Sequence, residues 1–212
     1  MASTKAFTGQ VTVLSMLALT IAQQKGTITQ ARFEEMVKEL QGIPEKISMV
    51  LKNAEPVKEL SKIFTYARNF IYLGRGYNYP AALEGALKLK EISYIHSEAY
   101  ASGELKHGTI SLIEEGTPVI AAATYMPLFD KAMSNVVEVQ ARGARVLALT
   151  TETGAERMHS RVARVLTVPE TETMLLPQLG VVPLQLLAYY IALARGCDID
   201  KPRNLAKSVT VE

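Results

Sequence analysis

Short apolar runs that alternate with helical stretches constrain the fold of this chain more than any other feature. Phe70 to Leu73, Pro118 to Thr124 and Arg145 to Thr150 favour strands. Helical patterns follow them from about Pro80, over Leu128 to Ala141 and over Gly154 to Arg164. Val165 to Val168 is a fourth run. Strands that alternate with helices form parallel sheets, because parallel neighbours need crossovers that cover the faces of the sheet. The sequence therefore predicts an α/β fold, a three-layer, doubly wound parallel sheet.

The first third of the chain is expected to be helical, so that helices precede the sheet. Val11 to Ala22 is mostly apolar, and Gly26 stands where a glycine often ends a helix. Thr29 to Leu40, with Thr29 as the candidate N-cap, predicts a second helix, and Ile43 to Leu51 predicts a third after Gly42. No internal repeat or linker is evident, and the length of 212 residues favours one domain over 1–212.

Leu175 to Ala194 contains no charge over 20 residues, the length that spans a bilayer. Two prolines and two glutamines interrupt it. Helices that cover a parallel sheet are often apolar nearly all round. We interpret this stretch as a buried core helix and expect no membrane span.

Charge and cysteine content limit the partners and the compartment. The 23 basic and 21 acidic residues nearly cancel and are scattered, which argues against nucleic acid as a partner. Cys197 is the single cysteine, so neither an internal disulfide nor a cysteine metal site is expected. The first residues lack the pattern of a signal peptide, and a cytoplasmic location is expected.

The turn Gly74-Arg75-Gly76 follows the first predicted strand. In doubly wound sheets, ligands bind outside the carboxyl ends of the strands, where helix N-termini favour anions. Glycines at such a place serve a tight turn about as often as a phosphate site. Both interpretations stay open from the sequence.

Glu84, Lys88 and Glu91 are spaced four and three residues apart in the helix that follows this turn, so they project from one side of it. A solvated face with a Glu-to-Lys pair is the common explanation of such spacing. The alternative is a general base, Glu91, among charges that tune its pKa.

His107 lies in Ile95 to Gly108, a segment dense in polar groups and poor in core-forming residues. It is a better candidate for acid-base work than His159, which lies among arginines and is expected to be exposed. Lys207, in the polar tail after Gly196, is flanked by small residues. A partly shielded lysine with a lowered pKa can attack a carbonyl. A structural histidine and a solvated lysine are the alternatives.

Four stretches together resemble the isomerase domain of the glucosamine-6-phosphate synthases. They are Ala2 to Thr8, Leu83 to Glu91, Gly103 to Gly108 and Pro202 to Glu212. The resemblance covers essentially the whole chain, and the tail is very specific. It implies a sugar-isomerase (SIS) fold, with a five-stranded parallel sheet that occurs twice per chain.

The resemblance also implies roles. Glu91 matches the base that moves a proton between two carbons of the aminated sugar, and Glu84 and Lys88 match supporting charges. Lys207 matches the lysine that forms a Schiff base with fructose 6-phosphate, and His107 matches a histidine that opens the sugar ring in the neighbouring subunit. A homodimer follows from this last role.

Further implications concern substrate contacts and cofactors. Ser3 and Ala206 match positions that contact the sugar, as do Glu91 and Lys207. Fructose 6-phosphate and glucosamine 6-phosphate are the expected ligands, and neither a metal nor a cofactor is required.

Two parts of that family have no counterpart in the chain. Met1 and Ala2 stand in place of a glutaminase domain with a terminal cysteine, and the half that holds the phosphate-binding loop is absent. We therefore expect the chain to be the second SIS half, with a tail at about 198–212, of a longer enzyme that converts fructose 6-phosphate and glutamine to glucosamine 6-phosphate and glutamate. Alone it should have little or no activity. The alternative is a non-catalytic module that binds sugar phosphates.

Overall fold

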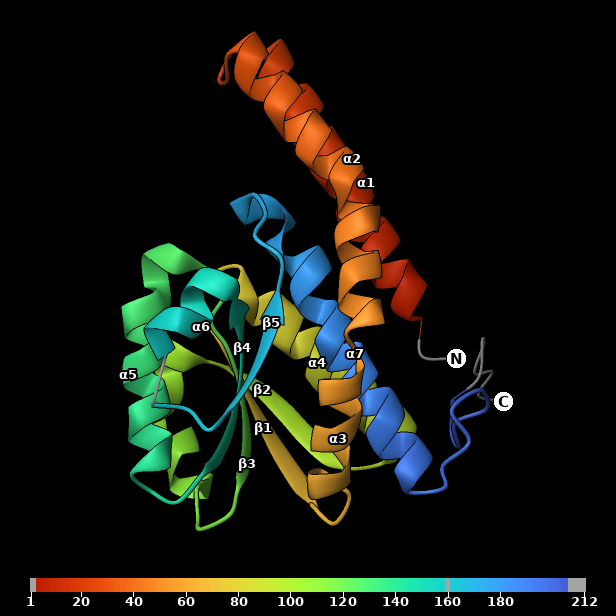
Figure 1. Ribbon diagram of the computed structural model, residues 1–212, viewed down its shortest axis with the longest axis vertical. Coiled ribbons are helices and arrows are strands. Elements are labelled where there is room, and N and C mark those ends of the chain that lie inside the picture. Colours follow the sequence, from red (N-terminus) through yellow and green to blue (C-terminus); the bar gives the residue numbers. More distant parts are fainter. Residues whose placement is uncertain (1–2, 159–160, 206–212) are drawn as a thin grey trace, which may run out of the picture.

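A five-stranded parallel sheet forms the centre of the molecule (Figure 1). The computed structural model describes residues 3–158 and 161–205. The strand order is β2-β1-β3-β4-β5, and the strands are β1 (Asn69–Gly74), β2 (His96–Ala101), β3 (Pro118–Ala122), β4 (Arg145–Thr151) and β5 (Arg164–Val168). The predicted doubly wound α/β fold is confirmed.

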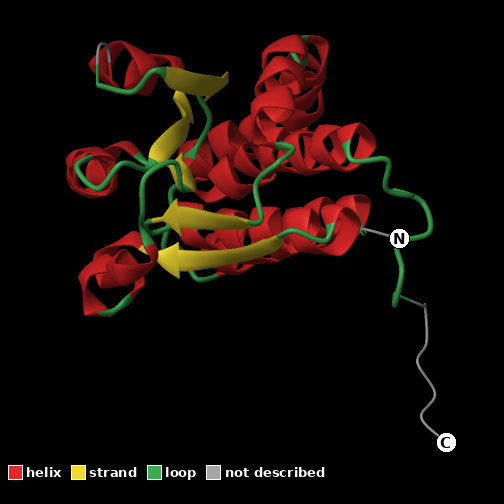
Figure 2. Cartoon of the chain, turned by 90° about the horizontal axis from the view of Figure 1, so that it is seen from below, coloured by secondary structure: helices red, strands yellow, loops and turns green. Residues whose placement is uncertain are grey.

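Helices cover both faces of this sheet, and the edge-on view shows the three layers (Figure 2). The helices of one face are α3 (Glu55–Phe64), α4 (Asn78–Ser93) and α7 (Leu176–Ala194). The helices of the other are α5 (Phe129–Gln140) and α6 (Glu152–Met158). Short 3-10 segments join them: η1 (Ser102–His107), η2 (Thr109–Leu112), η3 (Met126–Leu128) and η4 (Thr173–Leu175).

Neighbouring residues of the strands point to opposite faces, so each face has its own core. Tyr72 of β1 packs in the core shared with α4 and α7, whereas Ile71 and Leu73 pack in the core shared with α5. β1, β3 and β4 are buried on both faces and read as continuous apolar runs, which made them predictable. Of the two edge strands, β5 was predicted from its apolar residues, whereas β2 has mixed polarity and was not predicted.

The uncharged stretch from Leu175 to Ala194 forms the end of η4 and α7, and it is a core helix as predicted. Leu179, Leu184, Leu187 and Ile191 are fully buried against the sheet. By length and composition two described helices would suffice to cross a membrane, Thr4–Gln24 and Thr173–Ala194, and the second is largely buried within the fold.

The first two helices, α1 (Thr4–Gln24) and α2 (Gln30–Lys52), form a hairpin that projects beyond the sheet (Figure 1). Thr29 caps α2 as predicted, since its hydroxyl accepts the N–H of Arg32 at 3.2 Å. The predicted break between two helices after Gly42 is wrong, because α2 continues through Pro44. Apolar residues at helical spacing on both sides of the proline pack in the core that also contains α7: Leu40, Ile43, Ile47 and Val50. Their burial outweighs the one hydrogen bond that the proline removes.

The other deviation concerns the helix predicted from Gly154 to Arg164. In the structure α6 ends at Met158, and β5 begins at Arg164. His159 lies outside the described residues. Val162, ahead of β5, is buried in the core on the α5 side.

The sequence of α1 is similar to that of α7 over one helix and the glycine that ends it. Shifted by 170 positions, seven residues coincide: Val11, Leu14, Leu17, Ala18, Ile21, Ala22 and Gly26 with Val181, Leu184, Leu187, Ala188, Ile191, Ala192 and Gly196. Both helices end in the same way. The glycines have φ of 64° and 69°, and the next N–H bonds to the carbonyl of Ala22 or Ala192 at 3.0 Å.

Two glycines give opposite predictions for substitution by alanine. A Cβ added to Gly42, inside α2, would have nothing within 4 Å of it, so Gly42→Ala should stabilise the chain by up to about 1 kcal/mol. A Cβ on Gly74 would lie 2.5 Å from the carbonyl oxygen of Asn78, so Gly74→Ala should destabilise it by about 2 kcal/mol or more. Urea unfolding measures both. Equal effects of the two substitutions would contradict the close packing assigned to the β1–α4 turn.

Candidate active site

The three charges predicted on one side of α4 form a compact ion triad in the structure. Lys88 Nζ lies 2.5 Å from Glu91 Oε2 and 3.5 Å from Glu84 Oε1. The Lys88 side chain is only 4% exposed, and those of Glu84 and Glu91 are 13% and 22% exposed. The common explanation, a solvated face, is therefore wrong.

Burial sets the electrostatics of this ion triad. Burial raises the pKa of Glu84, and the attraction of the Lys88 ammonium offsets only part of this effect. A buried ammonium between two carboxylates compensates one negative charge and leaves the other. Lys88 Nζ donates a hydrogen bond to Glu91 Oε2, so the ammonium fixes the position of this carboxylate on α4.

A hollow of about 420 Å³ adjoins Glu84. It is lined by Phe7 of α1, by the outer side of α4 and by Ser97 and Glu98 of β2. Ser3, a predicted sugar contact, precedes α1 at this end of the molecule and has a left-handed backbone with φ of 50°. A second hollow of about 380 Å³ lies between β5 and the junction of α2 and α3, and it includes none of the predicted site residues.

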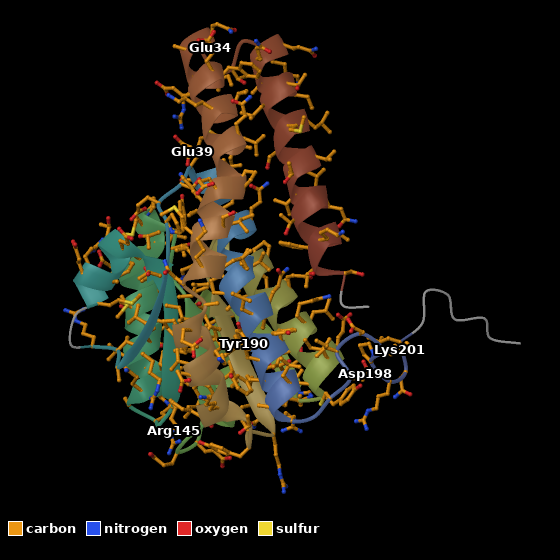
Figure 3. All side chains as sticks on the ribbon, turned by 45° about the vertical axis from the view of Figure 1, so that its right-hand side comes forward. Glu34, Glu39, Arg145, Tyr190, Asp198 and Lys201 are labelled. Atoms are coloured by element: carbon orange, nitrogen blue, oxygen red, sulfur yellow. The ribbon has the colours of Figure 1, made fainter. Side chains whose placement is uncertain are left out.

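The tail returns to the same end of the molecule. Cys197 and Ile199 pack against the core that includes Phe7, and Figure 3 shows Asp198 and Lys201 beside the ends of α4 and α7. The N–H of Arg203 donates to Tyr94 Oη at 2.8 Å. Lys207 and Ala206 lie outside the described residues.

The structure does not bring His107 to the ion triad. His107 ends η1, where its Nδ1 lies 2.7 Å from Glu104 Oε2 and its side chain is 73% exposed. The neighbouring Lys106 pairs with Glu138 of α5 at 2.8 Å, and Leu105 belongs to the core on the α5 side. His107 therefore faces away from α4 within one chain.

The Gly74-Arg75-Gly76 turn serves close packing. Gly74 admits the backbone of α4, and a Cβ added to Gly76, whose φ is 58°, would lie 3.1 Å from Tyr125 and 3.2 Å from Leu128. The ring of Tyr77 packs edge-on against that of Tyr125 at 5.5 Å. Aromatic side chains thus occupy the place where ligands bind in many sheets of this type, and the tight-turn alternative is favoured. Among the described residues, no group of three or more histidine, cysteine or acidic side chains has the geometry of a metal site.

The parallel sheet and the charged helix α4 lie in a stretch that matches a known class of domain. Residues 63–195 match the family model of the SIS domain, and the chain belongs to this family. The match begins in α3 and ends after α7, so it leaves out α1 and α2.

Within this family the chain is similar to glutamine–fructose-6-phosphate aminotransferases (isomerizing). The relative from Bacteroides thetaiotaomicron is 57% identical over 212 residues, and that from Clostridium tetani is 51% identical over 211 residues. Each match covers 100% of this chain and 34% of the relative, so the chain spans about a third of their length.

A solved structure gives the same result. The C-terminal domain of glucosamine-fructose-6-phosphate aminotransferase from Francisella tularensis superposes with a TM-score of 0.91 and 40% identity. The match covers 94% of this chain and 56% of that domain. The resemblance inferred from the sequence motifs is confirmed.

Two carboxylates should give opposite pH dependences of stability. Because the folded pKa of Glu84 is raised above its ordinary value of 4.5, its stabilisation is complete below that value and is lost as the pH rises through the folded pKa. Urea unfolding from pH 3 to 8 should therefore show the wild type losing stability relative to Glu84→Gln as the pH rises.

Glu39→Gln is the matched control. Burial of Glu39 favours its neutral form, but hydrogen bonds from Lys46 and Thr171 outweigh burial and lower its pKa. The wild type should therefore lose stability relative to Glu39→Gln as the pH falls below the ordinary value. The same pH slope in both variants would contradict the assigned environments.

Proposed function

We propose that the chain is the sugar-isomerising part of a longer glutamine:fructose-6-phosphate aminotransferase, which makes glucosamine 6-phosphate and glutamate. The observation that carries the proposal is 57% identity, across every residue of the chain, to a relative of that name. The buried ion triad of α4 supports it, because an isomerisation needs a fixed carboxylate of tuned basicity.

In this proposal Glu91 moves the proton. Replacement of the C2 oxygen by nitrogen gives a ketose imine. Transfer of a proton from C1 to C2, with the proton of the C1 hydroxyl passing to the nitrogen, converts it to the aldose amine. One carboxylate can serve both carbons because they are adjacent. Lys88 donates to Glu91 Oε2 and keeps the carboxylate in place while Oε1 accepts and returns the sugar proton. Glu84 balances Lys88 from the opposite side.

Lys207 supplies the nucleophile in this proposal. Its neutral amine adds to the open-chain carbonyl, loses water and forms an imine, which activates C2 toward ammonia. Ammonia then replaces the lysine, so the lysine is regenerated. Ser3 and Ala206 are proposed to contact the sugar, and its phosphate is held by the part of the longer protein that lies outside this chain.

His107 is proposed to open the sugar ring in the site of a neighbouring subunit of a homodimer. Its exposure of 73% and its position on the side away from α4 support a role across a subunit boundary. The carboxylate of Glu104 orients the imidazole through Nδ1, which leaves the other ring nitrogen for proton transfer.

The exposed side of α1 is proposed to cover a second sheet of the same kind in the longer protein. Leu14, Leu17 and Ile21 are 62%, 53% and 43% exposed, whereas their counterparts in α7 are fully buried against the sheet. Because α1 shares the apolar residues by which α7 packs on its sheet, α1 is expected to pack on a sheet as well. This assignment places α1 in a different structural unit from the single domain expected over residues 1–212.

Variants of the proposed chemical groups test the function. In the longer protein, Glu91→Gln and Lys207→Ala should each lower formation of glucosamine 6-phosphate by at least about 100-fold, with the melting temperature preserved. Glu34→Gln, on the projecting hairpin (Figure 3), is the control and should leave turnover unchanged. Normal turnover in both site variants, with the sugar phosphate still bound, would favour the non-catalytic module instead.

The α1 proposal predicts that one triple substitution acts differently in two contexts. Changing Leu14, Leu17 and Ile21 to serine should leave the unfolding of the 212-residue chain nearly unchanged, but should lower the melting temperature of the longer protein by about 10 °C or more. The matched serine triple at Leu184, Leu187 and Ile191 should prevent folding in both. An unchanged melting temperature of the longer protein with the α1 triple would contradict the proposal. A 212-residue chain that is dimeric and becomes monomeric on the α1 triple would contradict it too.

A further inference from the structure

Tyr94 has a backbone conformation that tyrosine rarely adopts. It ends α4 with φ of 60° and ψ of 20°, in the left-handed region. Helix ends of this geometry usually carry glycine, because a side chain there is strained. Only Tyr94 and Ile95 connect α4 to β2, so the short connection imposes the conformation. A bulky residue at a glycine position indicates that the side chain has a use that outweighs the strain.

The side chain of Tyr94 holds the tail in two ways. Its hydroxyl accepts the backbone N–H of Arg203 at 2.8 Å, and the guanidinium of Arg203 lies over its ring at 4.1 Å from the centroid. A turn in the tail precedes Arg203. Asp198 accepts the N–H groups of Lys201 and Asp200, and these bonds lower the pKa of Asp198; Pro202 is buried beside them.

We propose that Tyr94 is a positioning residue that sets the distance between the base on α4 and the nucleophile of the tail. Tyr94 follows Glu91 by three residues, less than one helical turn, so it moves with the ion triad. Lys207 follows Arg203 by four residues, which an extended chain covers in about 14 Å. Fixing Arg203 on Tyr94 therefore limits where Lys207 can act. The inference rests on the proposed function.

Tyr94→Phe is the central variant, because it keeps the ring and the backbone strain and removes only the hydroxyl. In the 212-residue chain, the Arg203 amide should exchange with solvent several-fold faster, which NMR measures without any activity. In the longer protein, kcat should fall about 5- to 10-fold while KM for fructose 6-phosphate stays the same, because the grip on the phosphate lies elsewhere. The melting temperature should not change.

Tyr66→Phe is the matched control, since the Tyr66 hydroxyl accepts a hydrogen bond from Arg145 at 2.6 Å, far from the tail in sequence. It should leave kcat unchanged. Arg203→Lys should keep most of the activity and Arg203→Ala should not, and Tyr94→Phe combined with Arg203→Ala should be no worse than the poorer single variant.

The outcomes separate this inference from the proposed function. Faster exchange at Arg203 with normal kcat would overturn the positioning role, and so would unchanged exchange with unchanged kcat. A Tyr94→Gly variant with full activity would overturn it as well. If the wild-type longer protein made no glucosamine 6-phosphate, the proposed function would fail, while the exchange measurement would still decide whether Tyr94 holds the tail.

Discussion

The close approach of α4 and α7 is the contact on which the rest of the structure depends. A Cβ on Gly85 would lie 2.7 Å from Leu184 Cδ1, so only glycine lets the two helices meet over Tyr72 of β1. This contact closes the core of one face, since Leu184 and Tyr72 are fully buried. It also fixes the rotation of α4. With Gly85 turned toward α7, Glu84, Lys88 and Glu91 come to lie along one flank of the helix, where Lys88 is buried between two acids.

That flank shows how a helix of a core can carry chemistry. A charged side chain placed at random on a buried helix would lose its hydration without compensation. Here each carboxylate forms an ion pair with the Lys88 ammonium. Helix α4 packs against β1, β2 and α7 together, which fixes the position of the ion triad. His107, in contrast, lies at the end of the short segment η1.

Much of the fold could be predicted from the sequence, because buried parallel strands are apolar on both faces and α7 is uncharged. The strand β2 could not, since His96 to Ala101 reads as polar, whereas β5, at the other edge, keeps an apolar sequence. The continuation of α2 through Pro44 was missed because the local penalty of proline is visible in the sequence and the packing of Ile47 and Val50 is not. For the site, spacing alone left Glu84, Lys88 and Glu91 undecided until burial distinguished them from a solvated face. Tyr94 gave no signal, because a left-handed tyrosine is recognised only from its backbone angles and its distant partner Arg203.

The projecting hairpin has a consequence for the order in which a longer protein would be synthesised. Helix α1 leaves the ribosome before any strand of the SIS match, and domains generally fold as units from the N-terminus. If α1 is the last helix of a preceding unit, as proposed, that unit can begin to close while the strands of the SIS match are still being synthesised. This order would limit the exchange of covering helices between the two proposed sheets.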